Sequence, residues 1–118
     1  GVLRECHPEL CFWALNGKQA MHFNKKKAPG QQQRLRVLER YFPQCLALFK
    51  QASSEFLRRE VARDDIIDAM VCAVTAKDGY GRYRTAPASP ALDGQGLPME
   101  IVYYLPDRYA GEGRYPVY

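Results

Sequence analysis

The sequence predicts a mixed α/β fold in which helices pack on a small number of strands. Between residues 31 and 76, apolar residues recur at the three-to-four-residue spacing of helices that pack on a core. Toward the C-terminus, Met99 to Tyr104 has the alternating, β-branched and aromatic composition of a strand, which would place Met99, Ile101 and Tyr103 on one face. Two helices followed by a third, mostly apolar helix indicate layers packed on a sheet.

Length and composition indicate one small globular domain or part of a larger one. The chain has 118 residues, of which 47% are hydrophobic and 25% charged, so it is not disordered as a whole. A net charge of +4 permits an anionic partner without requiring one. The sequence shows neither an apolar run of about 20 residues nor a signal-peptide pattern. We therefore expect no membrane span.

The four cysteines show no C-x-x-C spacing. Cys45 and Cys72 fall within helical apolar patterns, where a thiol acts as a small hydrophobic group. We expect reduced thiols in a cytoplasmic setting, with neither a disulfide framework nor a zinc site.

The chain opens on a predicted strand from Val2 to Glu5 with no initiator Met, which is typical of a piece of a longer protein. Pro8 disfavours helical conformation at His7, so Glu5 comes where the strand ends. Carboxylates at strand ends often carry chemistry in α/β folds, although an ordinary strand-edge Glu is the alternative. His7 is either a ligand or base, or a capping residue.

A short helix is predicted from Glu9 to Leu15, followed by a turn and then an edge strand from Lys18 to Phe23. Lys25 to Gly30 forms a basic loop. Its lysine run either holds phosphate groups electrostatically or is simply solvated.

Two longer helices follow. The first is predicted from Gln31 to Phe42, with Arg34, Arg36 and Arg40 pointing outward. The second begins at Pro43 and runs to about Glu60, since proline is favoured in the first turn of a helix.

The C-terminal third is predicted to contain mostly loops around one strand. Gly79 to Arg84 mixes glycine, aromatic and basic residues, a composition suited to stacking on bases or to a flexible loop. Ala86 to Pro98 is rich in Pro and Gly and is expected to be a loop. After the predicted strand, Pro106 to Tyr118 is expected to be a loose tail.

The most informative stretch is the helix predicted from Asp64 to Ala76. At about 100° per residue, Asp64, Asp65 and Asp68 fall on one side of it and apolar residues on the other. Like charges at the edge of a core repel one another, and a hard divalent cation with oxygen ligands would neutralise them. The structural alternative is that Asp64 or Asp65 caps the helix. These two interpretations stand at even odds from this stretch alone.

Three groups of residues occur in an order that resembles a known family. They are Glu5-x-His7-Pro8-Glu9-x-x-Phe12-x-x-Leu15-Asn16-Gly17; Lys27-x-x-Gly30 with Arg34; and Asp64-Asp65-x-x-Asp68-Ala69 followed, after a loop, by Met99-Glu100-Ile101. Together they resemble the predicted RNase H-like nuclease family known as domain of unknown function 429, over most of residues 2–105.

The resemblance implies a ribonuclease-H-like fold, in which helices flank a central mixed sheet and carboxylates cluster where strands and the last helix converge. It implies a resolvase-type site, with Glu5 ending a strand and Asp65 and Asp68 on the final helix. Family members begin with a strand that bears an early Asp, then two further strands and a helix, which this chain lacks. We therefore expect a partial fold, with residues 1–105 forming the C-terminal part of the domain and 106–118 a tail.

The resemblance further implies a nuclease that cleaves phosphodiesters with bound Mg²⁺ or Mn²⁺, incomplete in these residues. The expected metal ligands are Glu5, Asp64, Asp65 and Asp68; Glu5, Asp65, Asp68 and His7 would act in catalysis, and Lys26, Lys27 and Arg34 would orient phosphates. Two alternatives remain open: a non-catalytic module that binds nucleic acid, and an RNase H-like protein that transfers phosphoryl groups on a nucleotide or small molecule. Strand edges left exposed by the missing half would favour self-association.

Overall fold

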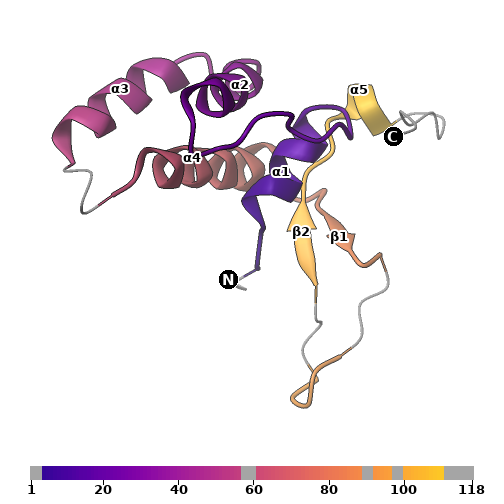
Figure 1. Cartoon of the computed structure of the whole chain (residues 1–118). Helices are drawn as coiled ribbons and strands as arrows, with labels where there is room; N and C mark the ends of the chain where they lie inside the picture. Colours follow the sequence, from indigo (N-terminus) through magenta and orange to yellow (C-terminus); the bar gives the residue numbers. More distant parts are fainter. Residues whose placement is uncertain (1–3, 57–60, 89–91, 97–99, 111–118) are drawn as a thin grey trace.

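One long helix, α4 (Arg63–Asp78), contacts every other long helix of the structure. The computed structural model describes residues 4–56, 61–88, 92–96 and 100–110. Figure 1 shows α2 (Ala28–Glu39) and α3 (Cys45–Glu55) on one side of α4, and α1 (Pro8–Leu15) crossing it toward the strands. None of the described helices is both long and apolar enough to cross a bilayer.

The strands form a small antiparallel hairpin beside α1 (Figure 1). Strand β1 (Arg84–Ala86) pairs with β2 (Ile101–Tyr103). On the other side of β2, Cys6 makes an isolated parallel bridge with Val102, whose N–H donates to the carbonyl of Glu5 at 2.8 Å. Both pairing directions therefore occur around β2, and the predicted mixed α/β class is confirmed.

The core lies where α1 and α2 pack on α4. Its fully buried large side chains include Phe12 and Leu15 from α1, Leu38 from α2, and Ile67 and Val71 from α4. Burying one such side chain contributes roughly 1.5–3 kcal/mol. The apolar face predicted for the acidic helix is thus buried, which fixes the direction in which its carboxylates point.

The predicted helices are present with shifted ends. The helix expected from Gln31 to Phe42 begins earlier, at Ala28, because Pro29 fits the first turn. The helix expected from Pro43 to Glu60 spans α3 only, and residues 57–60 lie outside the described residues. In the segment expected to be a loose tail, Asp107–Ala110 forms α5, while residues 111–118 lie outside the description.

The edge strand predicted from Lys18 to Phe23 is wrong. Lys18 has a positive φ of 63°, which interrupts an extended chain. The backbone N–H groups of His22 and Phe23 both donate to Oε1 of Gln33, at 3.1 Å, instead of to a neighbouring strand. A side chain of α2 thus binds the backbone groups that a sheet would have paired.

Arg34 does not point outward as predicted, because it is only 4% exposed. Its Nη1 donates to the carbonyl oxygens of Phe23 and Gly30, at 2.9 and 3.0 Å. Its Nε and Nη2 donate to the two carboxylate oxygens of Glu9, at 3.1 and 3.0 Å. A guanidinium tolerates burial when its donors are paired in this way. Arg34 therefore ties α1 and α2 to the end of the segment before the lysine loop.

Gly30 lets that loop lie close against α2. A Cβ at this position would come within 1.9 Å of the carbonyl oxygen of Asn24 and 3.0 Å of the backbone nitrogen of Lys25. Only glycine allows this approach of two backbones. Together with Arg34, it holds the loop that carries Lys25 and Lys26 beside the start of α4.

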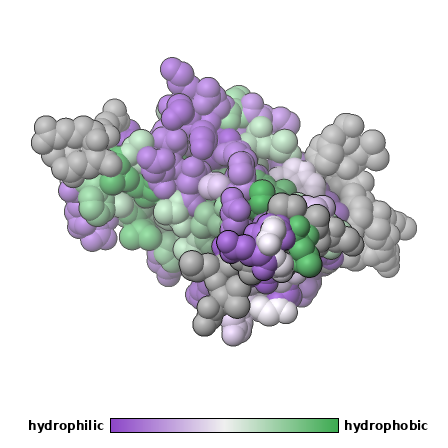
Figure 2. Space-filling model, turned by 90° about the horizontal axis from the view of Figure 1, so that it is seen from below, coloured by the Kyte–Doolittle hydropathy of each residue, from purple (hydrophilic) through white to green (hydrophobic). Residues whose placement is uncertain are grey.

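Some large hydrophobic side chains reach the surface. On the face seen in Figure 2, hydrophobic and hydrophilic side chains lie next to one another. Single exposed apolar side chains are normal on monomeric proteins, so this face does not by itself identify a partner. The exposed large residues include Phe23, Leu46, Leu48, Phe56, Tyr80 and Leu92.

We expect Gly30→Ala to destabilise the protein. Helix propensity alone would favour alanine by about 0.5–1 kcal/mol. The contact with the Asn24 carbonyl opposes this, and relieving such overpacking costs about 1–3 kcal/mol. Urea denaturation measures the free energy of unfolding. Gly94→Ala is the matched control, because a Cβ there meets nothing within 4 Å. Equal or higher stability of Gly30→Ala would contradict the close approach.

Arg34→Met should lower the free energy of unfolding by about 2–4 kcal/mol, because it leaves backbone carbonyls and Glu9 without their buried partner. Arg36→Met, on the same helix, should change it by less than about 0.5 kcal/mol, since Arg36 and Arg40 are exposed as predicted. The same denaturation measurement compares the two variants. Equally small changes in the free energy of unfolding of both variants would contradict a stabilising role of the Arg34 hydrogen bonds.

Candidate metal centre

The first turn of α4 carries the acidic residues. Ala62 occupies the N-cap position in extended conformation, and its carbonyl accepts the N–H groups of Asp65 and Ile66. Neither Asp64 nor Asp65 is therefore the N-cap residue, so the capping role is wrong. They lie two and three residues after the N-cap, where the positive end of the helix dipole stabilises carboxylates.

Three carboxylates meet at this point of the helix. One oxygen each from Asp64, Asp65 and Asp68 lies within 4.8 Å of the other two. Asp64 is buried, Asp68 is partly buried and Asp65 is exposed. Positions i, i+1 and i+4 share one side of a helix, and the buried apolar side of α4 sets which way they face. The predicted grouping of these three residues is confirmed.

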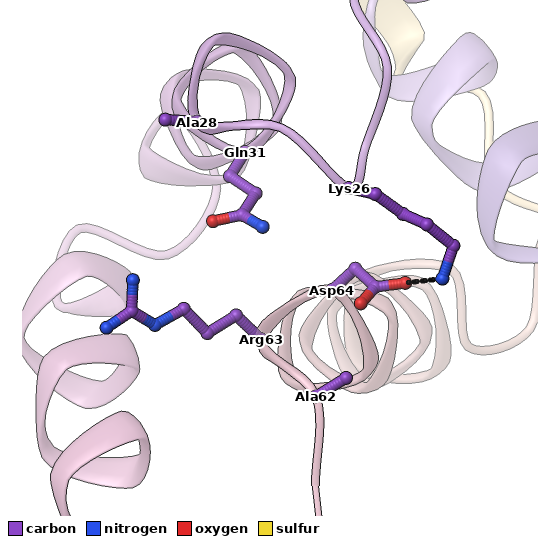
Figure 3. Close-up of a pocket in the computed structure, with 6 residues that line it drawn as sticks. All are labelled: Lys26, Ala28, Gln31, Ala62, Arg63 and Asp64. Carbon is purple, nitrogen blue, oxygen red and sulfur yellow. Dashed lines mark hydrogen bonds and ion pairs between the residues drawn. The ribbon is translucent and has the colours of Figure 1, made fainter. Parts of the chain in front are cut away.

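Two lysines of the loop before α2 face the carboxylates. Nζ of Lys25 lies 3.1 Å from Oδ2 of Asp68, and Nζ of Lys26 lies 3.4 Å from Oδ2 of Asp64 (Figure 3). The hydrogen bond to Asp68 raises the pKa of Lys25, with a smaller contribution from the charge of the same residue. The Lys26 side chain is 71% exposed. Its ion pair is therefore weak, in the range of about 0–1 kcal/mol.

One carboxylate oxygen of Asp68 receives no hydrogen bond from these groups. Its Oδ1 is buried and has no hydrogen-bond partner among the described residues. A buried acceptor left unpaired costs about 1–3 kcal/mol. A cluster made only of carboxylate oxygens is the donor set that Mg²⁺ and Mn²⁺ prefer. The residues present therefore fit a hard divalent cation.

A cavity of about 440 Å³ opens next to the cluster, between the starts of α2 and α4. In Figure 3 the amide of Gln31 and the carboxylate of Asp64 point into this space, while Arg63 extends toward its rim. Ammonium, amide and guanidinium groups can all donate to anionic oxygens. The cavity lining consists of Lys26, Ala28, Gln31, Ala62, Arg63 and Asp64.

The other predicted site residues belong neither to this cluster nor to the lining of the cavity. Glu5 is exposed and is not part of the 4.8 Å cluster. His7 and Lys27 are exposed at the N-cap positions of α1 and α2, and neither side chain makes a cap hydrogen bond. Arg34 is engaged with Glu9 and with two backbone carbonyls, so it does not face the cavity as a phosphate ligand. Sequence reasoning also missed Lys25: the lysine run was visible, but not which lysine faces Asp68.

The comparison with protein families covers the part of the chain that builds this centre. The model of the family described as Protein of unknown function (DUF429) matches residues 1–92. No curated protein and no solved structure matches the chain significantly. The matched residues include the lysine loop, the buried arginine and all three clustered carboxylates, whereas the Met99-Glu100-Ile101 segment lies beyond them. The chain belongs to the DUF429 family.

Proposed function

We propose that this protein contributes the acidic helix and the phosphate-facing loop of a metal-dependent nuclease with a ribonuclease-H-like fold. The observation that carries the proposal is the group of three carboxylates with the buried, unpartnered Oδ1 of Asp68. The proposed metal is Mg²⁺ or Mn²⁺, which takes oxygen ligands. The order of motifs that resembles RNase H-like nucleases supports the same assignment.

The proposal gives each group a distinct task. Asp64, Asp65 and Asp68 would hold the cation, which when bound supplies charge neutralisation for a phosphodiester and activation of water. Glu5 would be a further carboxylate ligand and His7 a proton carrier, as the resemblance implies. Both side chains are exposed and can be reached from solvent.

Phosphate binding is assigned to the cavity next to the cluster. Lys26 is the proposed hydrogen-bond donor there, because its side chain is mostly exposed while its Nζ already lies 3.4 Å from Asp64. Gln31 and Arg63 line the same space. A cation bound by the carboxylates would release Lys26 from Asp64 and leave its ammonium group available to a phosphate oxygen.

The segment from Gly79 to Arg84 supports a nucleic-acid substrate less than its composition suggests, because some of its side chains are engaged within the protein. Arg82 pairs with Asp107 at 3.1 Å and lies over the ring of Tyr104. The hydroxyl of Tyr83 donates to the carbonyl of Ala76. Tyr80 is strongly exposed and keeps a face that a base could stack on.

A second candidate function is a non-catalytic module that binds nucleic acid. It is favoured by the ion pairs Lys25–Asp68 and Lys26–Asp64, which balance part of the acidic charge without a metal ion. In that case the carboxylates position the basic loop, and the exposed parts of the lysines bind phosphates. Binding would then weaken steeply with salt and persist when divalent cations are chelated.

A Mn²⁺ titration followed by calorimetry tests the metal site. We expect saturable binding to the wild-type chain, and Asp68→Asn should weaken it by at least about tenfold, because a direct ligand matters no less than the outer-shell partners of a site. Asp78→Asn, at the other end of the same helix, is the matched control and should bind as the wild type does. Equal affinity of wild type and Asp68→Asn for Mn²⁺ would contradict the proposed metal site.

Cleavage of end-labelled DNA and RNA tests the nuclease itself, on the longest natural chain that contains this segment. We expect hydrolysis that requires Mn²⁺ or Mg²⁺, that chelation abolishes, and that Asp68→Asn lowers by at least about 100-fold while Asp78→Asn leaves it unchanged. Nucleic-acid binding with no cleavage, unaffected by Asp68→Asn, would favour the non-catalytic module instead.

A further inference from the structure

A cluster of three thiols is built around Cys72 of α4, which lies one helical turn after Asp68. Sγ of Cys6 and Sγ of Cys72 are 2.9 Å apart, although 66 positions separate the two residues in the chain. Cys11, which is fully buried in α1, interacts with both of them. All are free thiols. The extended segment before α1 and the helix α4 thus bring the pair together.

The spacing of the pair is that of a potential disulfide and not of a metal site. Two thiolates bound to one tetrahedral zinc ion, with Zn–S bonds of about 2.3 Å, would lie roughly 3.7 Å apart. A disulfide requires about 2.05 Å. At 2.9 Å the sulfurs are closer than in a zinc site, and a shift of about 1 Å would bring them to bonding distance.

Solvent species can reach this pair. Cys6 and Cys72 are only partly buried, and both line a cavity of about 270 Å³. Arg4 contributes a cationic group to the same cavity, and Tyr80 and Tyr83 form part of its wall. A small oxidant can therefore approach the sulfurs. Cys45, by contrast, is fully buried and lies outside this cluster.

Hydrogen bonds among the three thiols and their burial shift the pKa of each one. A hydrogen bond from the Cys72 thiol, the largest effect, lowers the pKa of Cys11 to about 7, against the opposing effect of burial. The same interaction raises the pKa of Cys72 well above its ordinary value. Burial raises the pKa of Cys6 as well, so the pair gains thiolate as the pH rises, and the thiolate is the form that reacts with oxidants.

We propose that Cys6 and Cys72 form a redox-modification site, in which a peroxide converts the thiol pair into a reversible intramolecular disulfide. The inference does not depend on the proposed nuclease function, because it rests on the contact of these two residues and the cavity that exposes them.

The reaction balances with hydrogen peroxide as the oxidant. One sulfur of the pair, as thiolate, attacks a peroxide oxygen; the O–O bond breaks, a sulfenic acid forms, and the leaving hydroxide becomes water on taking up a proton. The second sulfur then attacks the sulfenic sulfur, the S–O bond breaks, and a second water leaves as the S–S bond forms. Two thiols lose two electrons and one peroxide is reduced to two waters. An added dithiol reverses the step by exchange.

Peroxide treatment followed by thiol counting and peptide mapping tests this inference on the wild-type chain. We expect two of the four thiols to be lost, recovery with a dithiol, and a cross-linked peptide that joins Cys6 to Cys72. The cross-link closes a long loop, so the oxidised protein should migrate faster on a non-reducing gel and melt on the order of 10 °C higher.

Cysteine variants distinguish oxidation of the Cys6–Cys72 pair from non-specific oxidation of the thiols. Cys72→Ser and Cys6→Ser should each abolish the cross-link and the gel shift, whereas Cys45→Ala should retain both. Peptide mapping of the wild type needs no variant and so does not depend on how the variants fold. A cross-link between Cys11 and either partner, disulfides only between chains, four thiols unchanged by peroxide, or stoichiometric zinc retained on purification would each overturn the proposal.

Discussion

The buried guanidinium of Arg34 is the interaction on which the arrangement of the acidic site depends. It joins α1, through Glu9, to the carbonyls of Phe23 and Gly30 on either side of the lysine loop. Paired charge-assisted hydrogen bonds offset the cost of burying the charge. Because both ends of the loop are held, Lys25 and Lys26 face the first turn of α4. The site is therefore built from a rigid helix and a loop that is fixed at its two ends.

Charge balance at the start of α4 would connect the proposed metal binding to the proposed phosphate binding. Three carboxylates face two lysines and the positive end of a helix dipole, so among the described residues two of the three carboxylates have a lysine as ionic partner. A divalent cation that enters must compete with the lysines for the same oxygens. This competition would lower the affinity for the metal, but each displaced lysine would become free to donate hydrogen bonds to a phosphate. Metal and phosphate would then bind cooperatively, since each relieves the charge that opposes the other.

The sequence was sufficient where a feature depends on one element. Helical spacing predicted α1 to α4, and the spacing of Asp64, Asp65 and Asp68 predicted their grouping. The sequence did not predict features in which the interacting residues come from distant segments of the chain. The burial of Arg34 requires Glu9 and two backbone carbonyls, and no local pattern distinguishes it from exposed arginines. Strand β1 has only three residues without alternation, and the thiol cluster joins cysteines far apart in the chain.

The position of the first predicted ligand follows from the same contacts. The Glu5 carbonyl accepts the N–H of Val102, and the next residue, Cys6, touches Cys72 on α4. Cys72 lies one helical turn beyond Asp68, so the segment that carries Glu5 is anchored further along α4 than the carboxylate cluster. The exposed side chain of Glu5 stays outside the group of three. A cation shared by all four carboxylates would have to draw this side chain back along the helix. In the proposed site the three aspartates would then be the primary ligands, and Glu5 would be recruited by the metal.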